Sequence, residues 1–362
     1  MFAERLVRLI QPGDVIWVHD YHLIPLALLL RRLGVDNRIG FFLHTPLPGE
    51  DLLTCLPRHR ELLEAFAAHD LVGFQTEANL RAFMDYSRHE IGAVVADDGR
   101  IDACGRSFRA GAFAIGIDVG AIERAARQGQ RQAALQRLRD NLGQRQLLIG
   151  VDRLDYSKGI AERFAAFKRF LDEHPDKHGQ VTLLQITPRS RDDVAEYRQM
   201  RARLNRLTGA INGAHATPDW VPIHYLNRSF QHSTLAGYYR LADAALVTPL
   251  RDGMNLVAKE CVAAQDSDDP GVLVLSRFAG AACELRQALI INPYDPQEVA
   301  AGIARALAMS LTERQQRWRD LTASLRDNDI NHWRDRFLGQ LRQAERPPTR
   351  RQVLPLTAHD PH

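Results

Sequence analysis

The stretch Ala244-Ala-Leu-Val-Thr-Pro-Leu-Arg-Asp-Gly-Met-Asn-Leu-Val-Ala-Lys-Glu260 connects an apolar run to a helix-forming run through a short turn. Residues 244–247 predict a buried strand, and the residues from Asn255 onward favour a helix. Arg251-Asp252-Gly253 between them predicts a tight turn. A strand, a turn and a helix start in this order direct backbone N–H groups and the positive end of the helix to one point, which suits a phosphate group.

Two carboxylates of this stretch are candidate acceptors for sugar hydroxyl groups. Asp252 lies in the turn, and Glu260 follows in the helix, near the face of Leu256. An ordinary strand–helix junction in which Asp252 caps the helix explains the same local pattern. This stretch alone is compatible with a phosphate site and with an ordinary helix cap, and only other parts of the sequence can distinguish the two.

Size and composition indicate a globular protein of two domains. The chain has 362 residues, of which 45% are hydrophobic and 25% are charged. Its formal net charge is +3, with basic and acidic residues interspersed. No long basic stripe or aromatic–basic module is present in the sequence, so we expect no nucleic-acid partner.

The cysteines and the apolar segments indicate a cytoplasmic protein. None of the four cysteines (Cys55, Cys104, Cys261 and Cys283) forms a C-x-x-C pair, so we expect reduced thiols and neither a disulfide framework nor a zinc site. Residues 23–33 are apolar, but they are too few to span a bilayer, and the first residues carry charges instead of a signal-peptide core. A membrane partner is therefore not expected.

Apolar runs of strand length alternate with longer amphipathic segments along the chain. This alternation predicts an α/β fold with mainly parallel sheets. Residues 113–118 suggest a crossover between the two domains, and the residues from 345 onward lack apolar periodicity and are predicted to be disordered. The predicted strands are 15–18, 38–43, 71–74, 147–151, 181–186, 221–226 and 244–247, and two further apolar runs follow at 271–275 and 289–294. The predicted helices are 23–33, 58–69, 77–90, 121–142, 160–173, 192–208, 232–241, 299–309 and 313–343, the last interrupted near 327–329.

Polar residues follow several of the predicted strands. His19 and Asp20 end one strand, and His44 follows the next. Ligands gather at the carboxyl ends of strands in parallel sheets, so these residues are candidate ligand contacts, although a structural role for each histidine also fits. Arg153 and Lys158 follow the strand at 147–151, where two cations could neutralise a diphosphate leaving group or simply lie on the surface. Arg191 is a weaker candidate anion contact because charged neighbours surround it.

Several catalytic classes are excluded by missing motifs. The sequence has no G-x-x-x-x-G-K-[ST], no H-E-x-x-H and no G-x-S-x-G. Asp266-Ser-Asp268 has the D-x-D spacing of some metal-dependent sugar transferases, but it lies in a loop where aspartate is an ordinary turn residue. Without a metal, cations and helix ends must stabilise a leaving phosphate.

Five motifs in order carry a specific resemblance. The chain resembles the trehalose-6-phosphate synthases, which are retaining glucosyltransferases of the GT-B architecture with two Rossmann-like domains. The resemblance runs from about Gly13 to Leu341. The matching motifs are Trp17-Val-His-Asp-Tyr-His-Leu-Ile-Pro25, Phe42-Leu-His-Thr-Pro-Leu-Pro48, Val151-Asp-Arg-Leu-Asp-Tyr-Ser-Lys-Gly159, Tyr225-Leu-Asn-Arg-Ser-Phe230 and the stretch from Thr248 to Glu260.

The resemblance implies the substrates and a role for each candidate residue. The family uses a nucleotide-diphosphate glucose, usually UDP-glucose, and glucose 6-phosphate, and it needs no metal or other cofactor. Retention is attributed to front-face attack, in which the leaving phosphate takes the acceptor proton. The implied catalytic residues are Asp20, His44, Arg153 and Lys158. The implied donor contacts are Arg153 and Lys158 on the diphosphate, Asp252, Gly253, Met254, Asn255 and Leu256 on glucose and phosphate, and Glu260 on the ribose. His44 is implied beside the donor glucose, Asp20 on the acceptor sugar and Arg191 on the acceptor phosphate.

The chain also departs from the family pattern. Members carry roughly a hundred further residues before the position of Met1, so we expect a truncated amino-terminal sheet with exposed apolar edges and an incomplete acceptor site. A smaller departure is Ala114, where members commonly have proline. The expected division is an amino-terminal domain at 1–116, a donor domain at 117–326, a helix at 327–344 that returns to the first domain, and a tail at 345–362.

Three functional interpretations stay open at this point. The first is trehalose-6-phosphate synthesis. The second is glucosylglycerol-phosphate synthesis, which shares the donor motifs. The third is a non-catalytic chain that binds a nucleotide. A homo-oligomer is possible for each of them.

Overall fold

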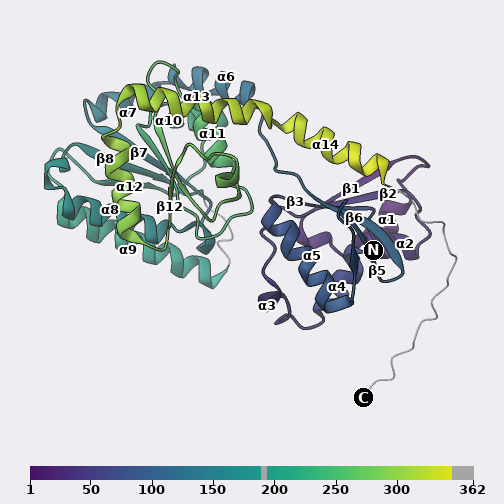
Figure 1. The fold of residues 1–362 in the computed structure, drawn as a ribbon. Coiled ribbons are helices and arrows are strands. Elements are labelled where there is room, and N and C mark those ends of the chain that lie inside the picture. Colours follow the sequence, from purple (N-terminus) through teal and green to yellow (C-terminus); the bar gives the residue numbers. More distant parts are fainter. Residues whose placement is uncertain (189–193, 345–362) are drawn as a thin grey trace. The chain divides into compact units, whose positions relative to one another are not determined.

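A computed structural model describes residues 1–188 and 194–344, which form two units (Figure 1). Unit 1 contains residues 1–43, 47–112 and the described residues from 337 onward, and unit 2 contains residues 44–46 and 113–336. Arg191 and the predicted tail from 345 lie outside the described residues. None of the described helices combines the length and the apolar character that a bilayer crossing requires.

Unit 1 is built on a sheet with the strand order β1-β2-β3-β6-β5-β4. Strands β1, β2, β3 and β6 are parallel, and β5 and β4 continue the sheet in antiparallel pairing. The strands are β1 (Val15–His19), β2 (Arg38–Phe42), β3 (Leu71–Phe74), β4 (Val94–Val95), β5 (Arg100–Ala103) and β6 (Arg106–Ala112). The helices are α1 (Phe2–Val7), η1 (Tyr21–Leu23), α2 (Leu26–Arg32), α3 (Glu50–Leu53), α4 (His59–Phe66) and α5 (Glu77–Ile91).

The edge strand β1 differs from the expectation of exposed apolar side chains. Its residues Val15, Ile16 and Trp17 are half-buried and Val18 is buried. The Trp17 ring stacks on Phe337 with ring centroids 4.5 Å apart and planes at 8°. The last residues of the carboxy-terminal helix therefore cover side chains of this strand, which is why the expectation is wrong for β1.

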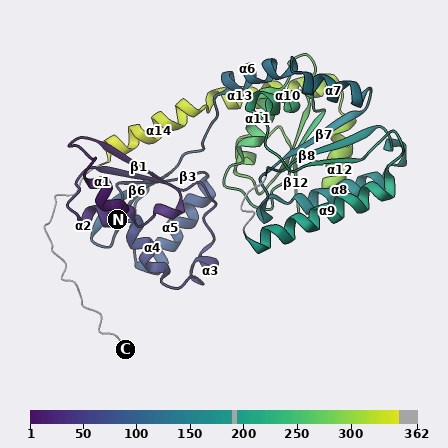
Figure 2. The same cartoon turned by 180° about the vertical axis from the view of Figure 1, so that it is seen from behind.

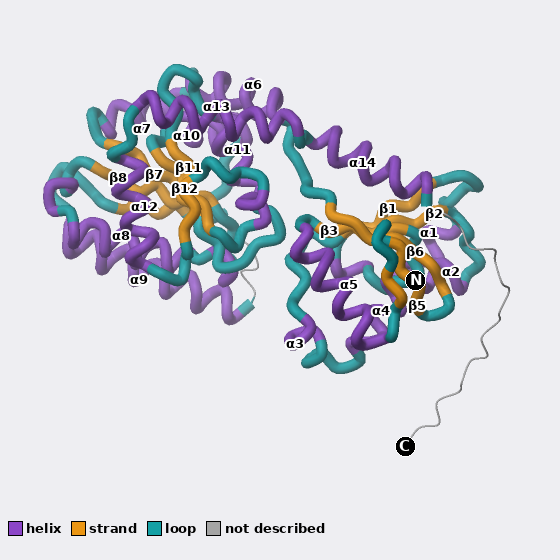
Figure 3. Tube along the Cα trace, viewed as in Figure 1, coloured by secondary structure: helices purple, strands orange, loops and turns teal. Residues whose placement is uncertain are grey.

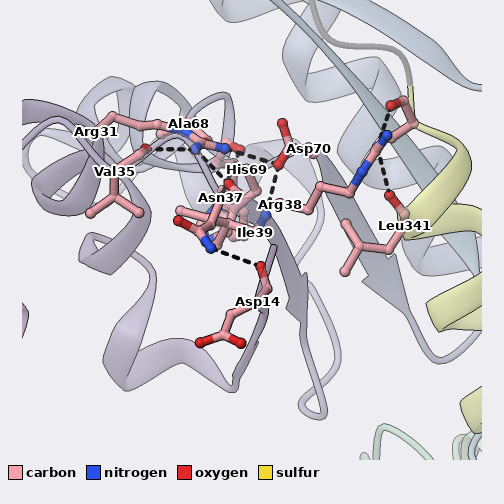
Figure 4. Close-up of polar contacts among 12 residues, drawn as sticks. Asp14, Arg31, Val35, Asn37, Arg38, Ile39, Ala68, His69, Asp70 and Leu341 are labelled. Carbon is pink, nitrogen blue, oxygen red and sulfur yellow. Dashed lines mark hydrogen bonds and ion pairs between the residues drawn. The ribbon is translucent and has the colours of Figure 1, made fainter. Parts of the chain in front are cut away.

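Arg31 and Asp70 connect three segments of unit 1 (Figure 4). The Arg31 guanidinium donates to the carboxylate of Asp70 at 2.9 Å and to the carbonyl oxygens of Val35 and Asn37 at 2.9 and 2.7 Å. The same Asp70 oxygen accepts from the backbone N–H of Ile39 at 2.7 Å. The loop after α2 and the starts of β2 and β3 are thus held by one ion pair with little exposure to solvent.

Replacing Arg31 by methionine is expected to lower the stability of unit 1 by about 3 kcal/mol, because breaking a largely buried ion pair leaves Asp70 without its counter-charge. Hydrogen exchange of the β2 and β3 amides measures this loss locally. The adjacent and exposed Arg32 is the matched control, and Arg32→Met should leave those amides unchanged. Equal exchange in the two variants would contradict a structural role for the pair.

Unit 2 contains a fully parallel sheet with the strand order β12-β11-β10-β7-β8-β9. Its strands are drawn in orange in Figure 3. The strands are β7 (Gln146–Val151), β8 (Val181–Ile186), β9 (Ile223–Leu226), β10 (Ala244–Val247), β11 (Val272–Ser276) and β12 (Leu289–Ile291). The helices before β9 are α6 (Val119–Gln130), α7 (Ala133–Leu142), η2 (Tyr156–Lys158), α8 (Ile160–Glu173), η3 (Pro175–Lys177) and α9 (Ala195–His215). The later helices are α10 (His232–Leu241), α11 (Leu256–Ala264), η4 (Gly280–Cys283), α12 (Pro296–Leu307) and α13 (Leu311–Asp327). Helix α14 (Ile330–Gln343) begins in unit 2, and its residues from Phe337 belong to unit 1.

Helices cover both faces of the unit 2 sheet (Figure 2). Alternate residues of β7 point to opposite faces, so Leu147 and Ile149 join one core and Leu148 joins the other. The first core includes residues of α6, α10 and α11, and the second includes residues of α8, α9 and α12. This burial on both faces explains why the strands read as continuous apolar runs.

Every strand predicted from an apolar run is present, but two predicted helices are divided, and α1, α3 and strands β4 to β6 are among the elements that had no prediction. Pro25 separates η1 from α2, because proline has no N–H to continue a helix. Residues 121–142 form two helices, since Gln132 is extended and its side chain bonds Ser233 and Thr234. Strands β4 to β6 had no prediction, because only alternate residues such as Ile101 and Phe108 are buried.

Candidate functional site

The order of strands in unit 2 reverses between β7 and β10. From β7 the chain adds β8 and β9 on one side, and it then returns to add β10, β11 and β12 on the other. Such a switch point opens a crevice at the carboxyl ends of the two strands. The loops that leave these ends are residues 152–159 and 248–255, which contain most of the predicted donor contacts.

The structure brings these two loops together through Lys158 and Asp252. The Lys158 Nζ atom lies 2.5 Å from Asp252 Oδ2, and both side chains are about five-sixths buried. The backbone N–H of Leu250 donates to the carbonyl oxygen of Ser157 at 2.7 Å. A cation and a carboxylate 94 residues apart therefore meet where the sequence predicted a ligand.

The turn at 251–255 is shaped by close backbone approaches and by Asn255. A Cβ atom on Gly253 would lie 1.9 Å from the carbonyl oxygen of His44, which places His44 beside this turn. Asn255 has a left-handed backbone (φ 77°), and its Oδ1 accepts from the N–H of Ala258 at 3.2 Å. Asn255 is thus the cap of α11. The alternative in which Asp252 caps the helix is wrong, because Asp252 Oδ2 binds Lys158 and Asn255 Nδ2 instead.

Glu260 lies on α11, half-buried beside Tyr239. The Tyr239 hydroxyl donates to Glu260 Oε2 at 3.4 Å. Burial raises the pKa of Glu260, although nearby His232 and the Tyr239 hydrogen bond oppose the shift. The exposed Leu256 lies one turn before it on the same helix, as the spacing predicted.

If Glu260 has the ribose contact that the resemblance implies, replacing it by glutamine is expected to lower the affinity for UDP about 10-fold, because a charged acceptor becomes neutral. The native carboxylate should lose this advantage as the pH falls through its raised pKa. The ratio of native to variant affinity, measured by titration calorimetry between pH 4.5 and 8, cancels the ionisation of UDP itself. An affinity ratio independent of pH would contradict the role.

The same substitution should not lower stability at neutral pH. Because burial raises the pKa of Glu260, the folded chain holds this proton more tightly than the unfolded chain. The contribution of Glu260 to folding therefore becomes less favourable as the pH rises from below the ordinary pKa to above the raised one. Glutamine removes that buried charge, so weaker UDP binding would not reflect unfolding.

The remaining predicted residues lie as follows. Arg153 is exposed at the end of β7. Asp20 belongs to unit 1, at the end of β1, where its left-handed backbone (φ 68°) is unusual for a non-glycine residue and its carboxylate accepts from the N–H of Tyr21 at 3.1 Å. The His44 ring lies 6.4 Å from that of Trp333 within unit 2. Met254 is buried beneath the turn.

The D-x-D segment has an ordinary structural role. Asp266 forms an ion pair with Arg240, and its other carboxylate oxygen accepts from the N–H of Asp268 at 3.2 Å. In the described part of the chain, no group of three or more His, Cys, Asp or Glu side chains has a geometry that could hold a metal ion.

One buried group beneath the site was missed at the level of sequence. Arg163 forms an ion pair with Asp152, whose pKa is raised by burial in spite of that partner. Its burial could have been predicted from the sequence, because Arg163 lies on the apolar face of a predicted helix, three residues after Ile160 and four before Phe167.

Two α/β units with largely parallel six-stranded sheets, and a cationic site at a switch point in one of them, define a GT-B glycosyltransferase. The chain belongs to glycosyltransferase family 20, whose sequence pattern matches residues 1–343. A trehalose-6-phosphate synthase of Sinorhizobium fredii is 50% identical over 340 residues, which are 94% of this chain and 73% of the relative.

Solved structures agree with this assignment. A UDP-forming α,α-trehalose-phosphate synthase of Burkholderia xenovorans in complex with glucose 6-phosphate superposes with a TM-score of 0.93 at 50% identity, covering 94% of this chain and 76% of the other. An Escherichia coli relative bound with UDP-2-fluoro glucose has a TM-score of 0.93 at 46% identity, covering 95% and 76%. The chain thus spans about three quarters of these relatives.

Proposed function

We propose that this chain transfers glucose from UDP-glucose to glucose 6-phosphate with retention of configuration, giving α,α-trehalose 6-phosphate. The observation that carries the proposal is the contact between Lys158 and Asp252, which joins the two strand-end loops into one site. The membership in family 20 and the ligands bound to the two relatives support the choice of substrates.

The donor diphosphate is assigned to Lys158, Arg153 and the start of α11. Lysine supplies a point charge and arginine a bidentate fork for phosphate oxygens. The first N–H groups of a helix have no intrahelical partner, and they add the positive end of the helix dipole. These groups favour the transition state because negative charge on the leaving diphosphate grows as the bond to glucose breaks.

The other contacts follow from the matched positions. Asp252 and the backbone from Gly253 to Leu256 hold donor glucose and phosphate, Glu260 accepts from the ribose, and His44 lies beside the donor glucose. Asp20 meets the acceptor sugar and Arg191 its phosphate. The anomeric hydroxyl oxygen of the acceptor forms the new bond to C1 of the donor glucose on the face from which UDP leaves. Its proton passes to the departing phosphate oxygen, so no side-chain nucleophile is required.

Two measurements test this proposal. Titration calorimetry with UDP tests the donor half, and a folded sample that binds no UDP would contradict the assignment of Lys158, Arg153 and Glu260. An assay with UDP-glucose and either glucose 6-phosphate or glycerol 3-phosphate tests the reaction. Product with glucose 6-phosphate alone supports the proposal. Product with glycerol 3-phosphate alone would indicate glucosylglycerol-phosphate synthesis, and UDP binding without any product would indicate a non-catalytic chain.

A further inference from the structure

A buried arginine connects three strand ends beneath the proposed donor site. The side chain of Arg163, on α8, is fully buried. Its Nη1 atom donates to Asp152 Oδ2 at 2.6 Å and to Gln185 Oε1 at 2.7 Å, and its Nε atom donates to Thr248 Oγ1 at 3.0 Å. Asp152 follows β7, Gln185 lies near the end of β8, and Thr248 follows β10.

The backbone leaves room for this network. A Cβ atom on Gly150 would lie 2.5 Å from Arg163 Nη1 and 2.4 Å from Gln185 Oε1, so a larger residue there would displace these two side chains. Gln185 is oriented in turn, because its Nε2 atom donates to Thr187 Oγ1 at 3.3 Å. The arginine therefore has defined partners on every strand that it reaches.

A contribution to folding stability does not by itself explain why the charged Arg163 is buried beneath the proposed donor site. Buried ion pairs are often no more stabilising than apolar side chains of the same volume. Arg163 Nη2 is also buried with no hydrogen-bond partner among the described residues, which adds a cost. What distinguishes the network is its location, since Asp152 directly precedes Arg153 and Thr248 begins the loop that contains Asp252.

We propose that Arg163 is a positioning residue of the donor site, which fixes the loops at 152–159 and 248–255 relative to each other so that Lys158 and Asp252 meet. The inference rests on the proposed function for its catalytic consequence. Its structural basis, one guanidinium bonded to both loops, is independent of the substrate. Misplacement of a substrate-binding group by about 1 Å can lower a rate by about 100-fold, so a fixed loop spacing has a large effect on transfer.

Thr248→Val tests the proposal with little change in volume, because it removes only the hydroxyl that accepts from Arg163. Thr248→Ser keeps the hydroxyl and is expected to restore native behaviour. The matched control is Asn212→Leu, which removes a partly buried connection between α9 and β9, where Asn212 bonds both backbone groups of Ile223 at 3.0 and 2.9 Å. Arg163→Met removes all of these hydrogen bonds at once and should have the larger effect. If that variant does not fold, Thr248→Val and Thr248→Ser still test the proposal.

Hydrogen exchange is the first readout and does not depend on activity. Thr248→Val should speed exchange about 10-fold in both loops, because their common anchor is weakened. Asn212→Leu should speed exchange near β9 and leave the loops unchanged. Faster exchange in only one loop, or equal effects of the two variants on both loops, would overturn the proposal.

Donor binding and kinetics are the second readout. For Thr248→Val we expect about 10-fold weaker UDP binding and about 10-fold lower kcat/KM for UDP-glucose, both recovered in Thr248→Ser. Asn212→Leu at equal folded fraction should change neither value, and a matching loss there would overturn the proposal. If the native chain binds UDP but forms no product, the proposed function fails, and loop exchange with UDP affinity still decides the role of Arg163.

Discussion

Replacing Lys158 by alanine is expected to lower kcat for glucose transfer by about 100- to 1000-fold, the effect of removing one preorganised group that stabilises charge in a transition state. Lys158 lies 2.5 Å from Asp252, so its ammonium is held in place within the site to which we assign the leaving diphosphate. The substitution also removes the counter-charge of Asp252 and leaves its Oδ2 atom with the hydrogen bond from Asn255 Nδ2 at 3.0 Å. We therefore expect KM for UDP-glucose to rise as well, but most of the loss in kcat/KM should come from the lower kcat.

Steady-state kinetics with UDP-glucose and glucose 6-phosphate measures both constants. Lys168→Ala is the matched control, since Lys168 forms an exposed ion pair with Asp172 on α8 at 2.6 Å and should affect neither constant. Circular dichroism and thermal unfolding show whether the fold survives. A folded Lys158→Ala chain with native kcat would contradict the catalytic role, and a chain that loses activity only because it unfolds would show that the role of Lys158 is structural.

The strands of the fold were predictable because their residues are buried on both faces. Leu147 and Leu148 pack in different cores, so β7 reads as an uninterrupted apolar run. Strands β5 and β6 lack that signal, since Ile101 and Phe108 alternate with polar residues. The available cues there were the turns at Gly99 and Gly105, both with positive φ, which bound the alternating residues.

The strand-end loops that carry the candidate residues were predictable from the sequence, but the contacts between these loops were not. Helix-start and turn chemistry indicated a phosphate site at 248–256, and strand ends indicated Arg153 and Lys158. The contact of Lys158 with Asp252 depends on β7 and β10 being neighbours, which is a property of strand order and not of local pattern. Arg163 was missed for the same reason, because its partners come from three different strands.

Replacing Gly280 by alanine is expected to lower kcat/KM for UDP-glucose by about 100-fold, because it displaces the turn that presents Asp252. A Cβ atom at Gly280 would lie 1.9 Å from the carbonyl oxygen of Gly253 and 2.8 Å from its carbonyl carbon. Both obstacles are backbone atoms, so a rotamer change cannot relieve the clash. The turn has to move, and the hydrogen bond from the Gly280 N–H to the Asp252 carbonyl oxygen at 3.1 Å is lost or lengthened.

The matched control for Gly280→Ala is Gly209→Ala on α9, where a Cβ atom would meet nothing within 4 Å. That variant should be more stable by up to about 1 kcal/mol, because alanine favours a helix interior, and its kinetics should be native. In Gly280→Ala, overpacking is expected to cost about 1–3 kcal/mol of stability, which leaves a folded chain whose loss of donor affinity can be measured. Native UDP affinity in that folded chain would mean that the turn at 252–254 does not position the donor. It would also contradict the assignment of Asp252 as a donor contact.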